Sequence, residues 1–122
     1  MIVRDGFYAS WRGLEYEAGP DGEEIRLYTG APAEGFTEVG PGRHVRVVAA
    51  DEVERLSYIT TMCEWQGEPF QVLGEHETWL RVEYAGTDPA VAARLGLELF
   101  DRGVHQAWAP RSDVRELREE RI

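Results

Sequence analysis

An internal repeat is the feature that most constrains what this 122-residue chain can fold into. The pattern Trp-x-Gly-x-x-aromatic-x-aliphatic occurs at residues 11–18 and again at residues 65–72. A second match joins residues 25–27 to residues 80–82, after one extra residue in the later copy. Since the matches keep their order, we predict two diverged copies of one unit, from about Phe7 to Leu56 and from about Thr61 to Leu117.

A third match is longer and needs no gap. Its matched pairs are Gly35 and Gly96, Phe36 and Leu97, Val39 and Phe100, Gly42 and Gly103, His44 and His105, Val53 and Val114, and Leu56 and Leu117. The later copy gains about six residues just before this match, over residues 87–96. Asp88 suits a helix N-cap, Pro89 a first helical position and Gly96 a C-terminal cap. We therefore predict a short helix near residues 89–95, with Val91 and Leu95 on its buried face.

Most of the remaining chain has the pattern of short strands. Apolar and polar residues alternate over residues 25–28 and 80–84, which is the period of a half-buried strand. Turn residues separate these runs, and Gly42 and Gly103 precede the next ones. The sequence predicts a mainly β fold in which each copy is a five-stranded small barrel or bent sheet.

Domain boundaries follow from the same pattern. We expect a first repeat over residues 1–57 and a second over residues 58–122, joined in one globular body. No glycine or proline interrupts residues 53–65. One strand could therefore close the first copy and open the second. We also expect Trp11 and Trp65, which recur in both copies, to be buried in the two cores.

The second copy resembles a Src-homology-3-like barrel. Residues 71–82 look like that family's second and third strands around their connecting loop, and residues 103–105 with 108–114 look like its closing stretch. In peptide-binding members, the tryptophan that opens the third strand and the proline before the closing helical turn line the ligand groove. The resemblance assigns these positions to Trp79 and Pro110, whereas the first copy has Glu24 near the Trp79 position and Ala49 at the Pro110 position.

Trp79 is the leading candidate for a partner contact. If Leu80 faces the core, strand alternation turns Trp79 outward, and exposed tryptophans often anchor protein interfaces. We group Pro110, Glu75, Glu77 and Tyr84 with it as candidate partner-binding residues.

Other sites have weaker signals. His44 and His105 occupy matching places in the two copies, so a twofold axis between the copies would bring them together. No further ligand follows either histidine at the spacing of a metal site. Cys63 matches Ala9 and has the pattern of a small buried residue. No phosphate loop, nucleophile elbow or acid–base pair is evident. We expect no catalytic residue, no metal and no cofactor.

Charge narrows the class of partner. The net charge is −10, from 23 acidic residues and 13 basic ones, and every basic residue is arginine. Such a chain repels nucleic acid and anionic membranes and attracts basic proteins. The single cysteine, and an N-terminus without a signal-peptide pattern, lead us to expect a cytoplasmic location.

These observations favour a non-enzymatic protein-binding module. In size, acidity and lack of motifs it resembles small acidic bacterial immunity proteins, which mask a basic toxin. The alternatives are a peptide-binding adaptor that uses the second repeat, and a small-molecule or enzymatic cleft between the repeats. The sequence leaves the partner's identity and the oligomeric state open.

Overall fold

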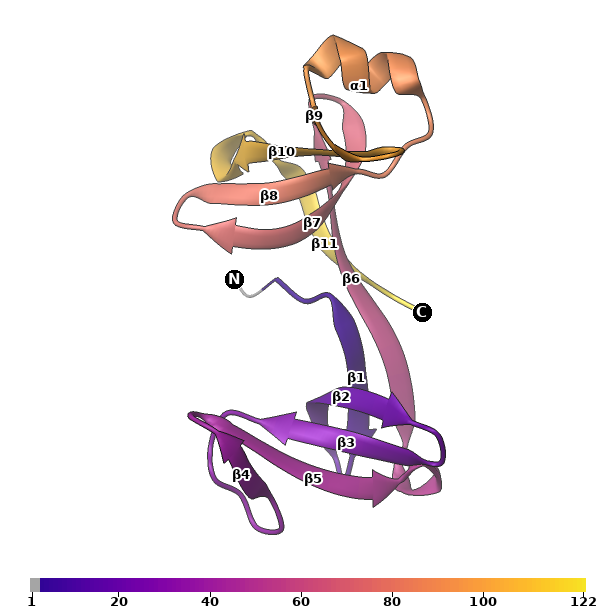
Figure 1. The fold of residues 1–122 in the computed structure, drawn as a ribbon, viewed down its shortest axis with the longest axis vertical. Coiled ribbons are helices and arrows are strands. Elements are labelled where there is room, and N and C mark those ends of the chain that lie inside the picture. Colours follow the sequence, from indigo (N-terminus) through magenta and orange to yellow (C-terminus); the bar gives the residue numbers. More distant parts are fainter. Residues whose placement is uncertain (1–2) are drawn as a thin grey trace. The chain divides into compact units, whose positions relative to one another are not determined.

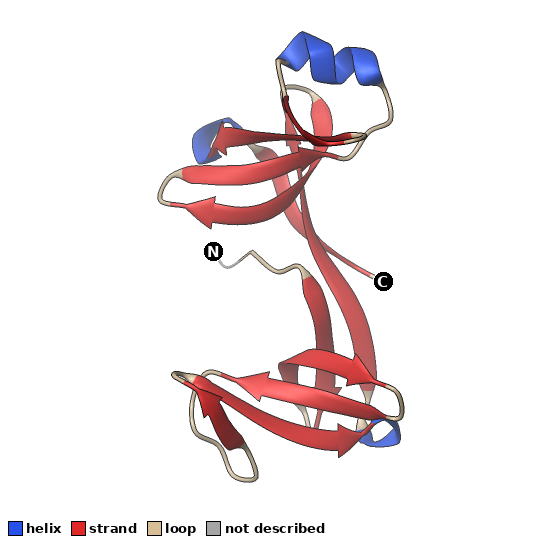
Figure 2. Cartoon of the chain, in the orientation of Figure 1, coloured by secondary structure: helices blue, strands red, loops and turns tan. Residues whose placement is uncertain are grey.

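The computed structural model describes residues 3–122 and has a mainly β fold with a single α-helix among those residues. Antiparallel pairing links its eleven strands. Figure 1 labels the strands along the chain, and Figure 2 colours helices, strands and loops. The chain divides into two compact units. We call Gly6–Ile59 with Arg121–Ile122 the N-terminal unit, and Thr60–Glu120 with the described residues up to Asp5 the C-terminal unit.

The N-terminal unit contains five strands, a 3₁₀ turn and the first half of a sixth strand. These elements are β1 (Gly6–Trp11), β2 (Leu14–Asp21), β3 (Glu24–Thr29), β4 (Thr37–Gly40), β5 (Arg43–Ala49), η1 (Ala50–Glu52) and β6 (Arg55–Trp65). The strand order is β4-β5-β3-β2-β1, and β1 also pairs with the first half of β6.

The C-terminal unit continues from the second half of β6. Its other elements are β7 (Glu68–His76), β8 (Trp79–Tyr84), α1 (Pro89–Leu95), β9 (Glu98–Asp101), β10 (Val104–Pro110), η2 (Arg111–Asp113) and β11 (Arg115–Arg121). The strand order is β6-β7-β8-β10-β9, and β11 pairs with β6. The strands of the two units therefore pair in the same order along the chain. β6 belongs to both units: its first half pairs with β1, and its second half pairs with β7.

Tight turns follow each Trp-x-Gly motif. Arg12 and Gly13 join β1 to β2 with φ angles of 51° and 80°, and Gln66 and Gly67 join β6 to β7 with φ angles of 57° and 76°. Two positive φ angles in a two-residue loop match the twist of a β-hairpin. The glycine supplies one of them without strain, so the motif recurs because both units turn sharply at this point.

Each unit buries its own apolar cluster. The N-terminal cluster contains Ala9, Trp11, Ile25, Leu27 and Val48. The C-terminal cluster contains Cys63, Phe70, Val72, Leu80, Val82 and Ala109. Trp11 is buried as predicted, at 5% exposed. The prediction is wrong in degree for Trp65, which is only half-buried and lines a surface hollow.

The predicted helix and the uninterrupted strand are both present. The Asp88 side chain accepts a hydrogen bond from the Ala90 amide at 2.9 Å, and Gly96 ends α1 with a φ of 64°. Val91 is buried, as the spacing indicated, while Leu95 is half-buried against the C-terminal cluster. β6 runs unbroken from Arg55 to Trp65, the segment without glycine or proline.

The described residues up to Asp5 belong to the C-terminal unit, and the last two residues of the chain belong to the N-terminal unit. The sequence did not indicate this arrangement. Near the N-terminus, Thr61 Oγ1 accepts a hydrogen bond from the Arg4 amide at 3.2 Å and donates one to the Arg4 carbonyl at 2.9 Å. At the other end, Ile122 and Tyr58 exchange two backbone hydrogen bonds, of 3.0 and 3.2 Å. Each end therefore completes the hydrogen bonding of one half of β6.

Candidate functional site

Trp79 begins β8 and lies opposite Pro110, the last residue of β10. Alternation along β8 sets its direction, because Leu80 points into the core at 1% exposed while Trp79 is 43% exposed. The prediction that Trp79 faces outward is confirmed. The two residues that the Src-homology-3 resemblance singled out thus lie side by side on neighbouring strands.

Two hollows meet at Trp79. One, of about 280 Å³, is lined by His76, Trp79 and Trp108. The other, of about 580 Å³, is lined by Glu77, Thr78, Trp79, Pro110, Arg111 and Ser112. Because Trp79 lines both, we treat them as one surface and call it the Trp79 groove.

Trp108 and His76 add aromatic area that we did not predict. Trp108 is 49% exposed, and the His76 ring meets it edge-on with the ring centroids 6.4 Å apart. Trp108 lies two residues before Pro110, so the strand period alone indicates that both share a face. His76 could be found only from the register between β7 and β8, where it lies opposite Trp79.

Charged side chains border the groove. Glu75 Oε2 accepts a hydrogen bond from the Arg111 guanidinium at 3.1 Å. Glu77 begins the turn between β7 and β8 with a φ of 56°, in the left-handed region that favours glycine. The matching turn between β2 and β3 uses Gly22, with a φ of 63°. A carboxylate is therefore held at the rim of the groove in a strained backbone conformation.

Backbone hydrogen bonds join the two sides of the groove. The Arg111 amide donates to the Thr78 carbonyl at 2.9 Å, and the Val114 amide donates to the Arg111 carbonyl at 3.2 Å. In the N-terminal unit the Ala50 amide donates to the Glu23 carbonyl at 2.8 Å, and the Val53 amide to the Ala50 carbonyl at 3.3 Å. The same backbone frame is therefore built in both units.

The side chains on that frame differ between the units. In the N-terminal unit Glu24 lies opposite Ala49, where the C-terminal unit has Trp79 and Pro110. The hollow there, of about 490 Å³, is lined by Gly22, Glu23, Ala49, Ala50 and Asp51. The N-terminal unit therefore forms these backbone bonds without a tryptophan or a proline at the two matching positions.

Tyr84 is not brought to the groove. It ends β8, at the other end of the strand from Trp79, and its ring packs on Phe70 with the centroids 5.8 Å apart. Its hydroxyl accepts a hydrogen bond from the Asp88 amide at 3.4 Å. These contacts support the core and the loop that leads into α1.

The two matching histidines have different surroundings. His44, on β5 of the N-terminal unit, is buried, and its Nε2 lies 3.4 Å from a Glu38 carboxylate oxygen. His105, on β10 of the C-terminal unit, is half-buried and lines a small hollow of about 120 Å³ together with Tyr84 and Asp88. Over residues 3–122, no group of three or more His, Cys, Asp or Glu side chains could hold a metal ion.

Cys63 is a core residue. It is 1% exposed and lies opposite Phe70 on the neighbouring strand. Burial raises the pKa of its thiol to about 11, an effect that the positive charge of Arg118 partly offsets. The thiol is therefore protonated at neutral pH, which is the wrong state for a nucleophile.

Comparison with known proteins places the chain in a family. The family model described as "Uncharacterised conserved protein UCP033725" matches residues 3–122. The chain belongs to this family. No curated protein and no solved structure matches the chain significantly. Of the helices in the described part of this UCP033725 family member, none is long and apolar enough to cross a membrane.

Proposed function

We propose that this chain is a non-enzymatic, cytoplasmic protein-binding module that contacts a basic protein partner through the Trp79 groove. The observation that carries the proposal is the exposed pair of Trp79 and Pro110, on a backbone frame that elsewhere in the same chain carries Glu24 and Ala49. An exposed tryptophan is well suited to anchor a partner.

The proposal includes an architecture of two diverged Src-homology-3-like repeats. Its support is the matched order of strand pairing, with β1, β2, β3, β5 and β4 in one unit and β6, β7, β8, β10 and β9 in the other. The matched backbone bonds at η1 and η2 support it further. On this reading the N-terminal repeat keeps the structural frame, while the C-terminal repeat carries the binding surface.

Charge supports a basic partner. The net charge of −10 gives the chain a negative field, which speeds encounter with positive proteins. Glu77 lines the groove with Trp79, and Glu75 pairs with Arg111 at its border, so attraction and apolar contact act on the same surface. A protein that masks a basic toxin, in the manner of bacterial immunity proteins, has this combination. A proline-containing peptide in the groove is the second candidate, favoured by the adjacency of Trp79 and Pro110.

Site-specific photo-crosslinking in cells tests the proposal. A photoreactive residue in place of Thr78 should capture a protein with an isoelectric point well above 7, identified by mass spectrometry. The matched control replaces Glu23, which has the same place in the N-terminal unit. Capture at position 78 that disappears in a Trp79→Ala background supports the proposal. Equal capture at both positions, or capture that survives Trp79→Ala, contradicts it.

A further inference from the structure

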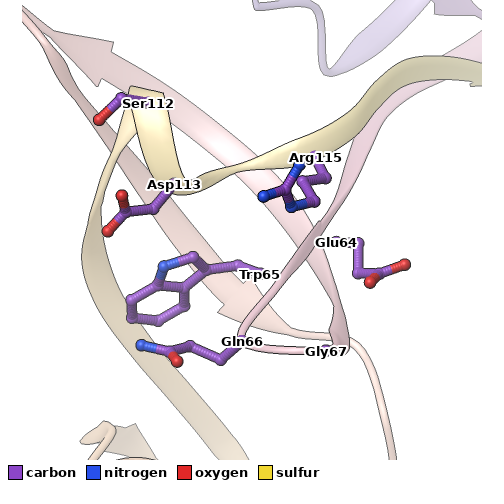
Figure 3. Close-up of a pocket in the computed structure, with 7 residues that line it drawn as sticks. All are labelled: Glu64, Trp65, Gln66, Gly67, Ser112, Asp113 and Arg115. Atoms are coloured by element: carbon purple, nitrogen blue, oxygen red, sulfur yellow. The ribbon is translucent and has the colours of Figure 1, made fainter.

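Another hollow in the C-terminal unit has polar walls. It has a volume of about 330 Å³, and Figure 3 shows the side chains around it. We call it the Trp65 pocket; its lining residues are Glu64, Trp65, Gln66, Gly67, Ser112, Asp113 and Arg115. It shares Ser112 alone with the Trp79 groove.

Two hydrogen-bond donors in the Trp65 pocket have no acceptor among the described residues. The Trp65 indole packs edge-on against Phe70, with the centroids 5.3 Å apart, while its buried Nε1 has no hydrogen-bond partner in residues 3–122. Figure 3 shows that nitrogen on the ring edge that faces Asp113 and Arg115. Arg115 is exposed and forms no ion pair with any described carboxylate. A buried N–H without an acceptor is costly, so it marks a place where an acceptor belongs.

The N-terminal unit shows which acceptor suits this position. There, the second residue after η1 is Glu54, and its Oε1 accepts a hydrogen bond from the amide of Gly13 in the Trp-x-Gly turn, at 3.2 Å. In the C-terminal unit the second residue after η2 is Arg115, beside the turn glycine Gly67. A guanidinium has only donors, so it cannot take the place of the Glu54 carboxylate. One unit supplies its own carboxylate, while the other presents a cation at the same point.

We propose that the Trp65 pocket binds an α-carboxylate whose Cα also carries an N–H donor, as in a free amino acid or the last residue of a peptide. The ligand's carboxylate accepts hydrogen bonds from the Arg115 guanidinium and from Trp65 Nε1. The N–H group of the ligand turns to the carboxylate of Asp113, which also lines the pocket. Arginine suits this role because its guanidinium can donate two parallel hydrogen bonds to one carboxylate.

The indole N–H of Trp65 gives a direct readout. The chain has four tryptophans, so a ¹⁵N-labelled sample gives four indole signals, and Trp65→Phe identifies the one from Trp65. The probes are glycine for a free amino acid, N-acetylglycine for a peptide terminus, acetate for the carboxylate alone and glycinamide for the amine alone. We expect glycine or N-acetylglycine to move the Trp65 signal saturably, and the one that binds more tightly identifies the source. Acetate should bind at least about tenfold more weakly, and glycinamide should have no effect.

The matched variants are Arg115→Glu and Arg102→Glu. Arg115→Glu copies the arrangement at Glu54, so it should fold normally and lose the response because its own carboxylate fills the position. Arg102→Glu makes the same charge change outside the pocket and should keep the response. The proposal is overturned if neither glycine nor N-acetylglycine moves the Trp65 signal up to about 50 mM, or if Arg115→Glu responds like the parent. It is also overturned if Asp113→Asn alone shifts the signal and the probes do not, since Asp113 is then the natural acceptor.

Discussion

Trp79 on β8 lies opposite Pro110 on β10, and the matching strand positions in the N-terminal unit hold Glu24 and Ala49. The chain therefore contains its own comparison for this surface. Both units keep the backbone bond that ties the β-hairpin turn to the following 3₁₀ turn, at 2.9 Å in one and 2.8 Å in the other. Since both units form these backbone bonds, the side chains are what distinguishes the two places.

The two tryptophans Trp11 and Trp79 should differ sharply in their contribution to stability. Trp11 is 5% exposed, so Trp11→Ala removes a buried ring and should lower the free energy of unfolding by about 3–5 kcal/mol. Trp79→Ala, at an exposed position, should lower it by less than about 1 kcal/mol. Trp65→Ala should fall between them, because Trp65 is half-buried. Urea melts followed by circular dichroism measure all three, and equal losses for Trp11→Ala and Trp79→Ala would count against the assigned core.

Stability should fall at high pH because of Cys63. The pKa of its thiol is raised to about 11 by burial, above its ordinary value of 9.0. The unfolded chain therefore releases this proton at lower pH than the folded chain does. The contribution of the protonated thiol to the free energy of unfolding is complete below about pH 9. It is lost as the pH rises from about 9 to 11.

Denaturant melts across this pH range measure the effect. Cys63→Ala is the matched variant, since Ala9 occupies the corresponding place on β1, and its stability should vary less between pH 9 and 11. An identical pH dependence in the parent and in Cys63→Ala would show that the thiol does not contribute.

Local patterns predicted much of the fold. Alternation placed Leu80 inside and Trp79 outside, and the caps at Asp88 and Gly96 located the helix within residues 89–95. These predictions succeed because each depends on neighbouring residues and on backbone geometry. The exchange of the chain ends escaped prediction, because the bonds of Arg4 to Thr61 join residues far apart in the sequence.

The candidate site was predicted only in part, because some of its residues come together through strand pairing and not through local sequence. Trp79 and Pro110 were identified, whereas His76 joins them only through the pairing of β7 with β8. Tyr84 shares a strand with Trp79, but the strand's length separates them. The orphan indole nitrogen of Trp65 depends on three-dimensional packing and has no signal in the sequence.

Association with a basic partner should depend steeply on salt. The charge of −10 attracts positive surfaces over distances that salt screens, so the association rate should fall as ionic strength rises while the dissociation rate changes little. Replacing Glu75 and Glu77 together by Gln should mainly lower the association rate. Stopped-flow measurements at low and physiological salt give these rates. An association rate that is flat over this range would eliminate electrostatic steering.

The affinity of Trp79→Ala for the protein captured at position 78 tests the central claim most directly. Surface plasmon resonance should show a loss of about 30-fold or more, mostly as faster dissociation, because a desolvated tryptophan anchor contributes about 2 kcal/mol or more. Glu24→Ala, the matched change in the N-terminal unit, should bind within about threefold of the parent. If Trp79→Ala binds as tightly as Glu24→Ala does, the Trp79 groove is not the contact surface.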